Sequence, residues 1–454
     1  MKKALLGFSI FLIMGCVSAP RVQLIPEAVL SAPGLNEGTT QKTTLHWWLS
    51  LQDEMLDELI ELGLEGSPTP QVALARFEQA QIGFEVIKAN RWPSLLGLGS
   101  RDVRNISGTS SDTRSDLGVL GFSWDAGLWG KRRLEIENAR QFKKQRWYEY
   151  QSVQLALSAS IAETYFQIIE QQMQLALLNS QLEVSRDLER LIEARFSRGQ
   201  SPVSDLYQQR ESTQSLKQLK IDRETNIEVL EKSLDVLVGE VPDSNARVKT
   251  KSMPSKLKVI DARQQREQTK YRPDIRAGYA RLQQVASVAG IRFAERLPSL
   301  QVTANLTSVS ERGATSEWVS RGLDLAIPIF AGGRLRDLEH QSLQALEEER
   351  QSYLALWLAV LEEVDGLNYQ YRQQKAVITS LEKRRGYASQ ALNAARNRYV
   401  LGDQNYLEVL VALKELQNAD RFLISEQLLL VILWVRTAEA TGQPICQNLE
   451  CLES

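Results

Sequence analysis

Long stretches of the chain repeat apolar residues every three or four positions, which places them on one face of an α-helix. Two of these stretches contain no proline inside a helix-length window, and an interior proline costs a helix about 3 kcal/mol. The apolar positions are Ile161, Tyr165, Ile168, Ile169, Met173, Leu177, Leu188, Ile192 and Phe196, then Leu354, Trp357, Leu361, Val364, Leu367 and Tyr371. The pattern predicts coiled-coil packing of long helices. One helix, from about residue 133 to 198, would be roughly 100 Å long at 1.5 Å per residue.

Two other stretches alternate polar and apolar residues, the period of a β-strand. The alternation is strict in 299–307 and 322–329, and weaker in 117–124, where its phase slips once. It predicts one hairpin in 95–128 and another in 299–330, with polar loops around Gly108 to Ser115 and Glu311 to Ser316. Strands of about ten residues have the length that crosses a bilayer at a tilt.

A soluble, half-buried sheet is the alternative interpretation of these strands. Open strand edges are not tolerated in lipid, so a membrane location requires several chains to close the sheet. Three chains with four strands each would supply twelve strands.

Two glycines separated by 203 positions, Gly199 and Gly402, end related sequences: Arg195-Phe196-Ser197-Arg198-Gly199 and Arg398-Tyr399-Val400-Leu401-Gly402. Further pairs with offsets of 203 or 205 are Gly130 and Gly333, Gly239 and Gly442, and Pro93-Ser94-Leu95 and Pro298-Ser299-Leu300. The chain is therefore interpreted as a tandem duplication of about two hundred residues. Each of the two glycines is expected to reverse a long helical segment.

The amino-terminal segment has the pattern of an export signal: Lys2-Lys3 precede the apolar run Ala4 to Met14, which is too short to span a membrane. Ile13-Met14-Gly15-Cys16 resembles a bacterial lipobox, in which cleavage leaves a lipid on Cys16. An ordinary signal peptide with an incidental cysteine is the alternative. In bacterial lipoproteins an Asp after the cysteine marks the inner membrane, so Val17 favours the outer membrane.

The remaining organisation follows from composition and proline placement. Trp47-Trp48 begin a segment with one apolar face, for which packing is the preferred interpretation. The predicted organisation is a signal peptide at 1–15, an extended lipid-anchored arm at 16–45, a first repeat at 46–242 with its turn near 195–203, a linker at 243–275, a second repeat at 276–443 with its turn near 398–406, and a tail at 444–454.

Composition and residue types exclude several functions. With 43% hydrophobic and 24% charged residues and a net charge of -2, the chain shows no reason to bind nucleic acid. His46 and His340 lack metal-ligand spacing, and no catalytic motif stands out, so neither an enzyme nor a cofactor is expected beyond the lipid. Cys446 and Cys451 either form a small disulfide loop or stay free thiols.

Five motifs occur in an order that resembles the TolC-like outer membrane efflux protein family, in particular its lipoprotein branch of drug-efflux exit ducts. They are Trp47-Trp48, Phe122-Ser123-Trp124-Asp125-Ala126-Gly127-Leu128-Trp129-Gly130, Arg272-Pro273-Asp274-Ile275, Pro328-Ile329-Phe330-Ala331-Gly332-Gly333-Arg334 and Arg398-Tyr399-x-x-Gly402. The resemblance implies a mainly α fold with a transmembrane β part: a homotrimer with a twelve-stranded barrel in the outer membrane, a long α-helical barrel in the periplasm and a mixed belt around it.

The resemblance also implies a function. The trimer would be the passive exit duct of a tripartite pump of the resistance-nodulation-division type, in contact with outer-membrane lipid, a periplasmic adaptor protein and an inner-membrane pump. The two glycine turns would lie at the periplasmic tip, with Arg195, Gly199, Arg398, Tyr399 and Gly402 at the adaptor docking site.

The same resemblance places a gate near the tip. Glu408 matches an acidic position of the closed tip, whereas Val411 replaces an acid that is common there. Three Glu408 side chains would form a collar favouring cations, with Val411 as an apolar constriction. A solvated acid at a helix start is the alternative for Glu408. Asp205 and Tyr399 match positions that hydrogen-bond in the closed state.

Two other functions remain open from the sequence: an exit duct for protein secretion, which shares the fold, and a periplasmic coiled-coil adaptor or rod. The rod interpretation agrees with the helices but not with the two alternating hairpins. The sequence leaves the substrate open among drugs, dyes, metals and oligosaccharides.

Overall fold

The computed structural model describes residues 47–104, 113–242, 247–249, 251–254, 257, 262–311 and 314–442. They form two compact units, and each unit takes segments from both halves of the chain. Unit 1 contains Ala75–Tyr148 and Arg276–Leu356, and the described part of unit 2 contains 47–74, 149–275 and 357–442. The compact units thus divide the chain differently from the predicted repeats, because each repeat contributes to both.

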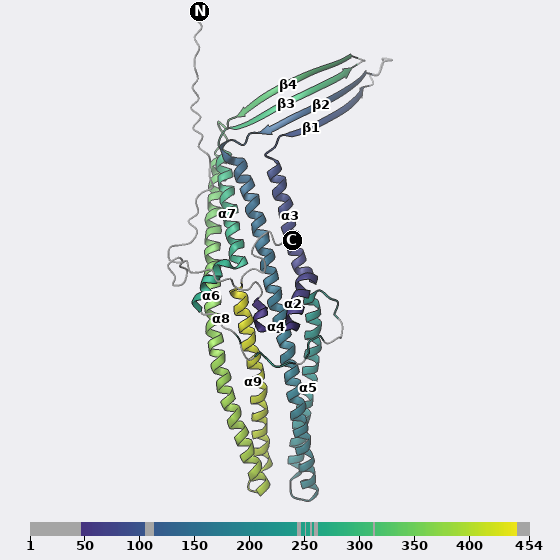
Figure 1. Cartoon of the computed structure of the whole chain (residues 1–454), viewed down its shortest axis with the longest axis vertical. Coiled ribbons are helices and arrows are strands. Elements are labelled where there is room, and N and C mark those ends of the chain that lie inside the picture. Colours follow the sequence, from purple (N-terminus) through teal and green to yellow (C-terminus); the bar gives the residue numbers. More distant parts are fainter. Residues whose placement is uncertain are drawn as a thin grey trace, which may run out of the picture. The chain divides into compact units, whose positions relative to one another are not determined.

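Unit 1 holds a four-stranded antiparallel sheet with the order β1-β2-β3-β4 (Figure 1). Its strands are β1 (Ser94–Arg104), β2 (Thr113–Asp125), β3 (Ser299–Glu311) and β4 (Ala314–Ala326). Both predicted hairpins are present. The second loop is shorter than the sequence suggested, because β3 extends to Glu311 and β4 starts at Ala314.

The rest of the fold is helical. Two long helices, α4 (Lys131–Ser197) and α8 (Arg334–Leu401), contain 67 and 68 residues, which corresponds to about 100 Å each. The other helices are η1 (Trp47–Leu51), α2 (Glu54–Gly66), α3 (Pro68–Ala89), η2 (Leu128–Gly130), α5 (Val203–Val238), α6 (Ala262–Gln268), η3 (Thr269–Tyr271), α7 (Pro273–Ala294) and α9 (Tyr406–Ala440). The prediction of long helices in the windows between prolines is confirmed.

In unit 2 the two adjacent tryptophans are packing residues, as the sequence suggested. Trp48 is fully buried, and the Trp47 ring centroid lies 5.9 Å from that of Trp434 on α9. The Trp47 indole Nε1 donates a hydrogen bond of 3.1 Å to the Ser158 hydroxyl on α4. The pair therefore joins the amino-terminal segment of this unit to the α4 and α9 helices.

One carboxylate fastens α2 to its surroundings. Asp53 is the N-cap of α2 and accepts a hydrogen bond from the backbone N–H of Leu56. Lys251 forms a 2.8 Å ion pair with the same oxygen, Oδ1, and the other oxygen, Oδ2, accepts a 2.8 Å hydrogen bond from the Tyr165 hydroxyl on α4. These hydrogen bonds and the lysine charge hold the pKa of Asp53 below its usual value, although burial opposes them as the largest single effect.

The end of α5 shows why a glycine is required there. Gly239 has φ +87°, and its N–H bonds to Val236 O while the next N–H bonds to Asp235 O, a Schellman ending. A Cβ atom at this position would lie 2.3 Å from the carbonyl oxygen of Gly66 at the end of α2. The close approach of the two backbones therefore depends on the missing side chain.

We expect Gly239→Ala to lower the midpoint of thermal unfolding strongly. The left-handed backbone alone costs about 1–2 kcal/mol for a residue with a Cβ, and the clash with Gly66 adds to it. Gly83→Ala is the matched control, since Gly83 lies inside α3 with nothing within 4 Å of its added Cβ. Equal midpoints for the two variants would contradict the assigned packing.

Candidate functional site

One face of the sheet is mainly apolar, and the other mixes polar and apolar side chains. Residues that lie opposite each other in an antiparallel pair share a face, so the register assigns every side chain. One face carries Leu95, Leu120, Phe122, Trp124, Leu300, Val302, Ala304, Leu306, Val319, Leu323 and Leu325, with Arg321 among them opposite Ala304. The other carries Ser123, Gln301, Thr303, Asn305, Thr307, Ser320 and Asp324, together with the apolar residues Leu96, Leu98, Leu117, Val119, Val309 and Trp318. Many of the apolar side chains are exposed, for example Leu323 at 70%.

In the first hairpin the sequence predicted that the polar–apolar alternation shifts by one residue. This shift does not come from a β-bulge. The register of β1 with β2 and of β2 with β3 runs without interruption. Leu98 and Val119 instead lie opposite each other on the polar face, while Phe122 lies on the apolar one. The weaker alternation in the sequence arises because both faces of this hairpin carry apolar residues.

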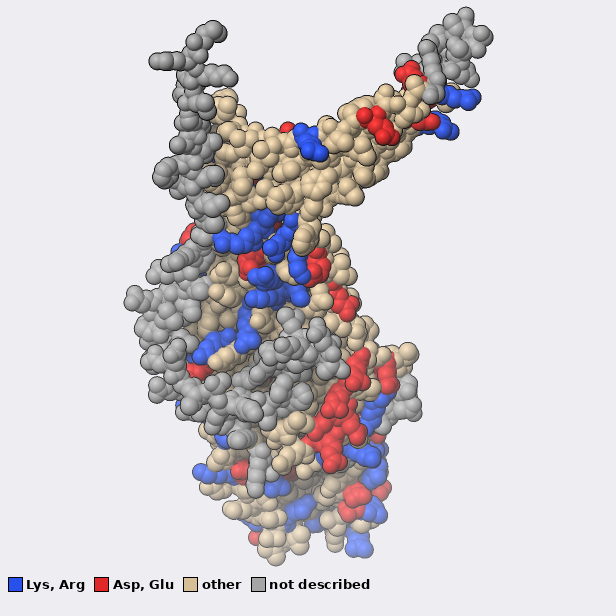
Figure 2. Space-filling model, turned by 45° about the horizontal axis from the view of Figure 1, so that its top comes forward, with Lys and Arg blue, Asp and Glu red and all other residues tan. Residues whose placement is uncertain are grey.

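Charged side chains gather towards the two ends of the strands, and fewer lie between them (Figure 2). Arg321, opposite Ala304, is one charged residue in the middle of β4. At the hairpin end, Arg101 and Asp116 form an exposed ion pair of 2.6 Å. At the other end, basic residues lie where strands join helices, among them Lys131 and Arg132 at the start of α4. This distribution fits an apolar band between two polar surfaces.

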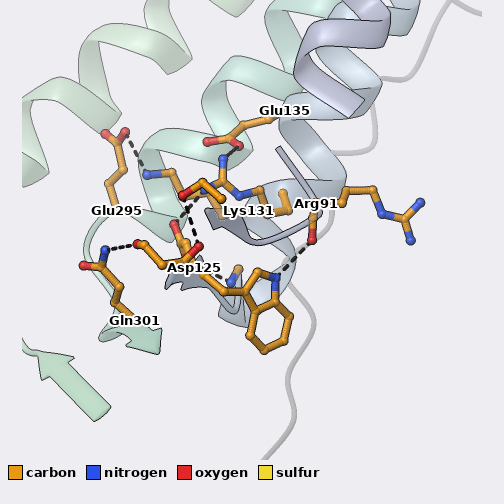
Figure 3. A network of polar contacts seen from close by, with 11 residues as sticks. Arg91, Asp125, Lys131, Glu135, Glu295 and Gln301 are labelled. Atoms are coloured by element: carbon orange, nitrogen blue, oxygen red, sulfur yellow. Dashed lines mark hydrogen bonds and ion pairs between the residues drawn. The ribbon is translucent and has the colours of Figure 1, made fainter. Parts of the chain in front are cut away.

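A polar network fixes the turn between β2 and α4 (Figure 3). Arg132 pairs with Asp125 at 3.0 Å and with Glu135 at 2.8 Å, and Lys131 pairs with Glu295 at 3.6 Å. The indole of Trp124 donates a 3.0 Å hydrogen bond to the backbone carbonyl of Arg91. Acids from separate segments thus neutralise the basic residues of this junction, which the sequence alone did not predict.

The two repeated glycine turns adopt the same ending. Gly199 and Gly402 have φ values of +74° and +85°, which favour glycine. In the first turn Gly199 N donates to Phe196 O and the following N–H donates to Arg195 O; in the second, Gly402 N donates to Tyr399 O and the following N–H to Arg398 O. These are Schellman motifs that end α4 and α8. The predicted left-handed glycines are confirmed.

Next to these turns, the α4–α5 and α8–α9 helix pairs share a small core. The Arg195 guanidinium lies 4.5 Å from the ring centroid of Tyr399, and the Tyr399 ring lies 5.9 Å from that of Tyr406. The buried residues of this core are Ile192, Leu206, Leu392, Ala395, Tyr406, Val409, Leu410 and Leu413. Arg195 and Tyr399, which the sequence assigned to the tip, are therefore brought together.

A buried hydrogen bond also links α9 to α5. The Tyr406 hydroxyl donates to the Gln209 side-chain oxygen, and the Gln209 amide donates to the carbonyl and hydroxyl oxygens of Ser185 on α4 at 2.7 and 2.8 Å. Burial raises the pKa of Tyr406, so this hydroxyl stays protonated as a donor. Sequence reasoning missed both residues. The sequence signal that could have found this bond is Gln209, a polar residue that lies three positions after Leu206, on the buried side of α5.

The predicted gate residues lie at the starts of α5 and α9. Asp205 accepts a 2.8 Å hydrogen bond from the Ser201 hydroxyl rather than from Tyr399. Within the described residues the Tyr399 hydroxyl has no hydrogen-bond partner. Glu408 and Val411 are exposed and line a groove of about 520 Å³. The opposite side of the groove is formed by small residues of α8, namely Ala388, Ala391 and Ala395.

Two predicted sites lie outside the described residues: lipid attachment at Cys16, and the cysteine pair Cys446 and Cys451. Within the described ranges, no helix is both long and apolar enough to span a bilayer. The same ranges contain no cluster of three or more histidine, cysteine or carboxylate side chains arranged to hold a metal ion.

Comparison with known proteins identifies the family. The profile described as "Outer membrane efflux protein" matches residues 59–240 and 266–443, one match for each repeat. The chain belongs to the outer membrane efflux protein family. It is 28% identical over 398 residues to the pyoverdine export outer membrane protein OpmQ of Pseudomonas aeruginosa, with 82% of each chain covered. It is 26% identical over 437 residues to the cation efflux system protein CusC of Escherichia coli, covering 91% of this chain and 92% of CusC.

A solved structure agrees with the fold. The outer-membrane channel OprN superposes with a TM-score of 0.83 at 20% sequence identity, covering 95% of this chain and 100% of OprN. The outer membrane efflux protein family consists of outer-membrane channels of efflux pumps, which are transport proteins and not enzymes. Its members form trimers within tripartite pumps and extend from the outer membrane into the periplasm. The family, the fold class and the channel function expected from the sequence are thus confirmed.

Proposed function

We propose that this efflux-family channel works as the passive exit duct of a tripartite pump of the resistance-nodulation-division type, closed and opened at its helical turns. The observation that carries the proposal is the sheet, which has one mainly apolar, exposed face, an opposite face that carries most of its polar side chains, and an unpaired edge on each side. Such a sheet is suited to a membrane only if its edges pair with other chains.

Three chains would close the sheet. In the homotrimer, β4 of each subunit pairs with β1 of the next, so that twelve strands surround a polar lumen. The apolar face, with side chains as exposed as Leu95 at 68% and Leu323 at 70%, then lies against lipid. The long helices α4 and α8 continue the duct as a helical barrel in the periplasm.

The tip made by the two Schellman turns would receive the periplasmic adaptor. Arg195, Gly199, Arg398, Tyr399 and Gly402 form this docking region. The glycines shape the reversals, while Val400 and Leu401 are exposed at 73% and 76%. An exposed apolar turn flanked by arginines fits an apolar hairpin tip of a partner protein.

The groove next to the tip would carry the gate. Glu408 and Val411 occupy the same exposed side of α9, one turn apart. In a trimer, three copies of each would face one another and form an acidic collar above an apolar constriction. The alternative is that Glu408 only stabilises the start of α9, where a carboxylate in the first turn is favourable.

Conductance in planar bilayers separates these two roles. We expect Glu408→Gln to lower the cation-over-anion permeability ratio of the purified trimer several-fold, since unit charges a few ångström from an ion contribute about 1 kcal/mol each even in water. Glu224→Gln is the matched control, because Glu224 is a half-exposed acid of α5 paired with Lys220. An unchanged ratio in Glu408→Gln would assign Glu408 to helix capping alone.

A second feature of the proposed gate is a contact between subunits. Within one chain Asp205 accepts a hydrogen bond from Ser201, and the Tyr399 hydroxyl is buried without a partner among the described residues, so a bond to a neighbour would require the tip to rearrange. We expect Asp205→Ala with Tyr399→Phe to increase the open time of single channels. Arg198→Ala, at the same turn, is the control for a general effect on the tip. Conductance that matches the wild type would place the closing contact elsewhere.

Lipidation of Cys16 would anchor the extended arm in the outer membrane next to the barrel. The proposal rests on the lipobox-like sequence Ile13-Met14-Gly15-Cys16 and on Val17. We expect Cys16→Ser to abolish labelling by radioactive palmitate in cells. Cys446→Ser serves as the control and should leave labelling intact. Label that persists in Cys16→Ser would refute attachment at this residue.

The substrate would be determined by the inner-membrane pump rather than by the duct. Similar channels are named for pyoverdine export, cation efflux and toluene efflux. Substrates this different are consistent with a channel whose lining discriminates between substrates mainly by their charge.

A further inference from the structure

The two repeats build the same junction between a strand and its long helix. Both long helices begin directly after a glycine with positive φ, α4 after Gly130 and α8 after Gly333. The turns that precede β1 and β3 are also equivalent. In each turn two consecutive backbone N–H groups donate to the carbonyl oxygen three residues earlier. These donors are Arg91 and Trp92 in the first turn, and Arg296 and Leu297 in the second. Lys131 therefore corresponds to Arg334, and Arg91 to Arg296.

Acids neutralise two basic residues around the turn before β3, one pair joining the two repeats and the other lying within the second repeat. Lys131 at the start of α4 pairs with Glu295, in the turn before β3, at 3.6 Å. Arg296 of the same turn pairs with Glu339 on α8. Both basic residues of this internal junction thus have a carboxylate partner.

The equivalent acids are missing at the two ends of the sheet. Glu295 corresponds to Asn90, and Glu339 corresponds to Ile136. Arg91 and Arg334 are exposed, and neither guanidinium has a hydrogen-bond or ion-pair partner among the described residues. Figure 3 shows the Arg91 side chain pointing away from the polar network that holds its backbone. Asp337, in the first turn of α8, pairs with Arg336.

Large apolar side chains lie next to these two arginines. Trp92 follows Arg91 and is 78% exposed, while Ile329 and Phe330, between β4 and α8, are 92% and 90% exposed. In the internal junction the corresponding region is covered: the Trp129 indole packs over the turn before β3 and donates a 2.8 Å hydrogen bond to Pro298 O. At the open edges of the sheet, therefore, the apolar side chains equivalent to the internal junction are exposed, and the arginines lack a carboxylate partner among the described residues.

Closing of the sheet by neighbouring subunits would bring the two edges together. If β4 pairs with β1 of the next subunit as β2 pairs with β3, Arg334 and Phe330 of one subunit meet Arg91 and Trp92 of its neighbour. This step rests on the trimer of the proposed function. Each seam then holds two unpaired arginines next to aromatic rings, at the depth where aromatic residues favour the interface between lipid and water.

We propose that each subunit seam binds the headgroup of an anionic phospholipid in the periplasmic leaflet. The phosphate accepts hydrogen bonds from Arg91 and from Arg334 of the adjacent subunit, since arginine binds phosphate through a planar fork of donors. The acyl chains lie along Trp92, Ile329 and Phe330. The bound lipid supplies the negative charge that Glu295 and Glu339 supply inside the chain.

Native mass spectrometry of the detergent-extracted full chain tests this proposal with phosphatidylglycerol and phosphatidylcholine as probes. The wild-type trimer is expected to retain phosphatidylglycerol in preference to phosphatidylcholine. Arg91→Gln with Arg334→Gln should reduce this retention by about tenfold or more, since each basic residue at a membrane surface contributes roughly fivefold. Arg198→Gln, which removes an exposed arginine at the other end of α4, should leave retention unchanged.

A second variant provides the charge without deleting an arginine. Asn90→Glu introduces at the seam the carboxylate that Glu295 provides internally, so it should also reduce phosphatidylglycerol retention. Equal retention of both lipids by the wild type, or retention unaffected in the double variant, would overturn the proposal. Binding of inorganic phosphate with the same arginine dependence, but no retained phosphatidylglycerol, would assign the arginines to a soluble anion instead. The same spectra report the mass of the assembly, so loss of the trimer contradicts the proposed function and is distinguished from loss of lipid.

Discussion

The whole structure depends on how the backbone hydrogen-bonding groups at the two edges of one small sheet are satisfied. Inside the chain, β2 and β3 are paired on both sides, but β1 and β4 each have one free edge. A row of unpaired N–H and C=O groups costs several kcal/mol per group in lipid. The apolar face of the sheet suits lipid, and its edges do not, so a single chain is only part of the functional unit.

The tandem repeat explains how the chain meets this constraint. Each repeat supplies one hairpin and one long helix, and the second hairpin joins the first through the pairing of β2 with β3. The same contact can be repeated between chains, because each turn that precedes a hairpin has an equivalent in the other repeat. Where equivalent positions of the two repeats carry different residues, the difference indicates a feature of the contact between subunits that the internal contact lacks. Asn90 in place of the acid Glu295 is such a difference, and it leaves a positive charge uncompensated.

Much of this architecture was readable from the sequence because its signals are local. Helices of 67 and 68 residues follow from proline-free windows with a spacing of three and four, and the turns at Gly199 and Gly402 follow from related sequences whose glycines are 203 positions apart. The sheet was also predicted, although its first hairpin gave a weak signal because Leu98 and Val119 face the polar side.

What the sequence did not predict depends on contacts between distant segments. The bond from Tyr406 to Gln209 joins residues 197 positions apart, and neither residue type is unusual in a helix. The pairs of Lys131 with Glu295 and Arg132 with Asp125 also need the fold before partners can be chosen from many charged residues. Asp205 was expected to bond Tyr399 through family resemblance, whereas a local hydroxyl, Ser201, occupies it within the chain.

Hydrogen–deuterium exchange of the protein extracted in mild detergent tests the central claim most directly. If subunits close the sheet through their edges, the amides of β1 and β4 will exchange as slowly as those of β2 and β3, because all four strands are then paired on both sides. Fast exchange confined to the outward-facing amides of β1 and β4, with protection of β2 and β3, would show that the edges stay open and would contradict the account.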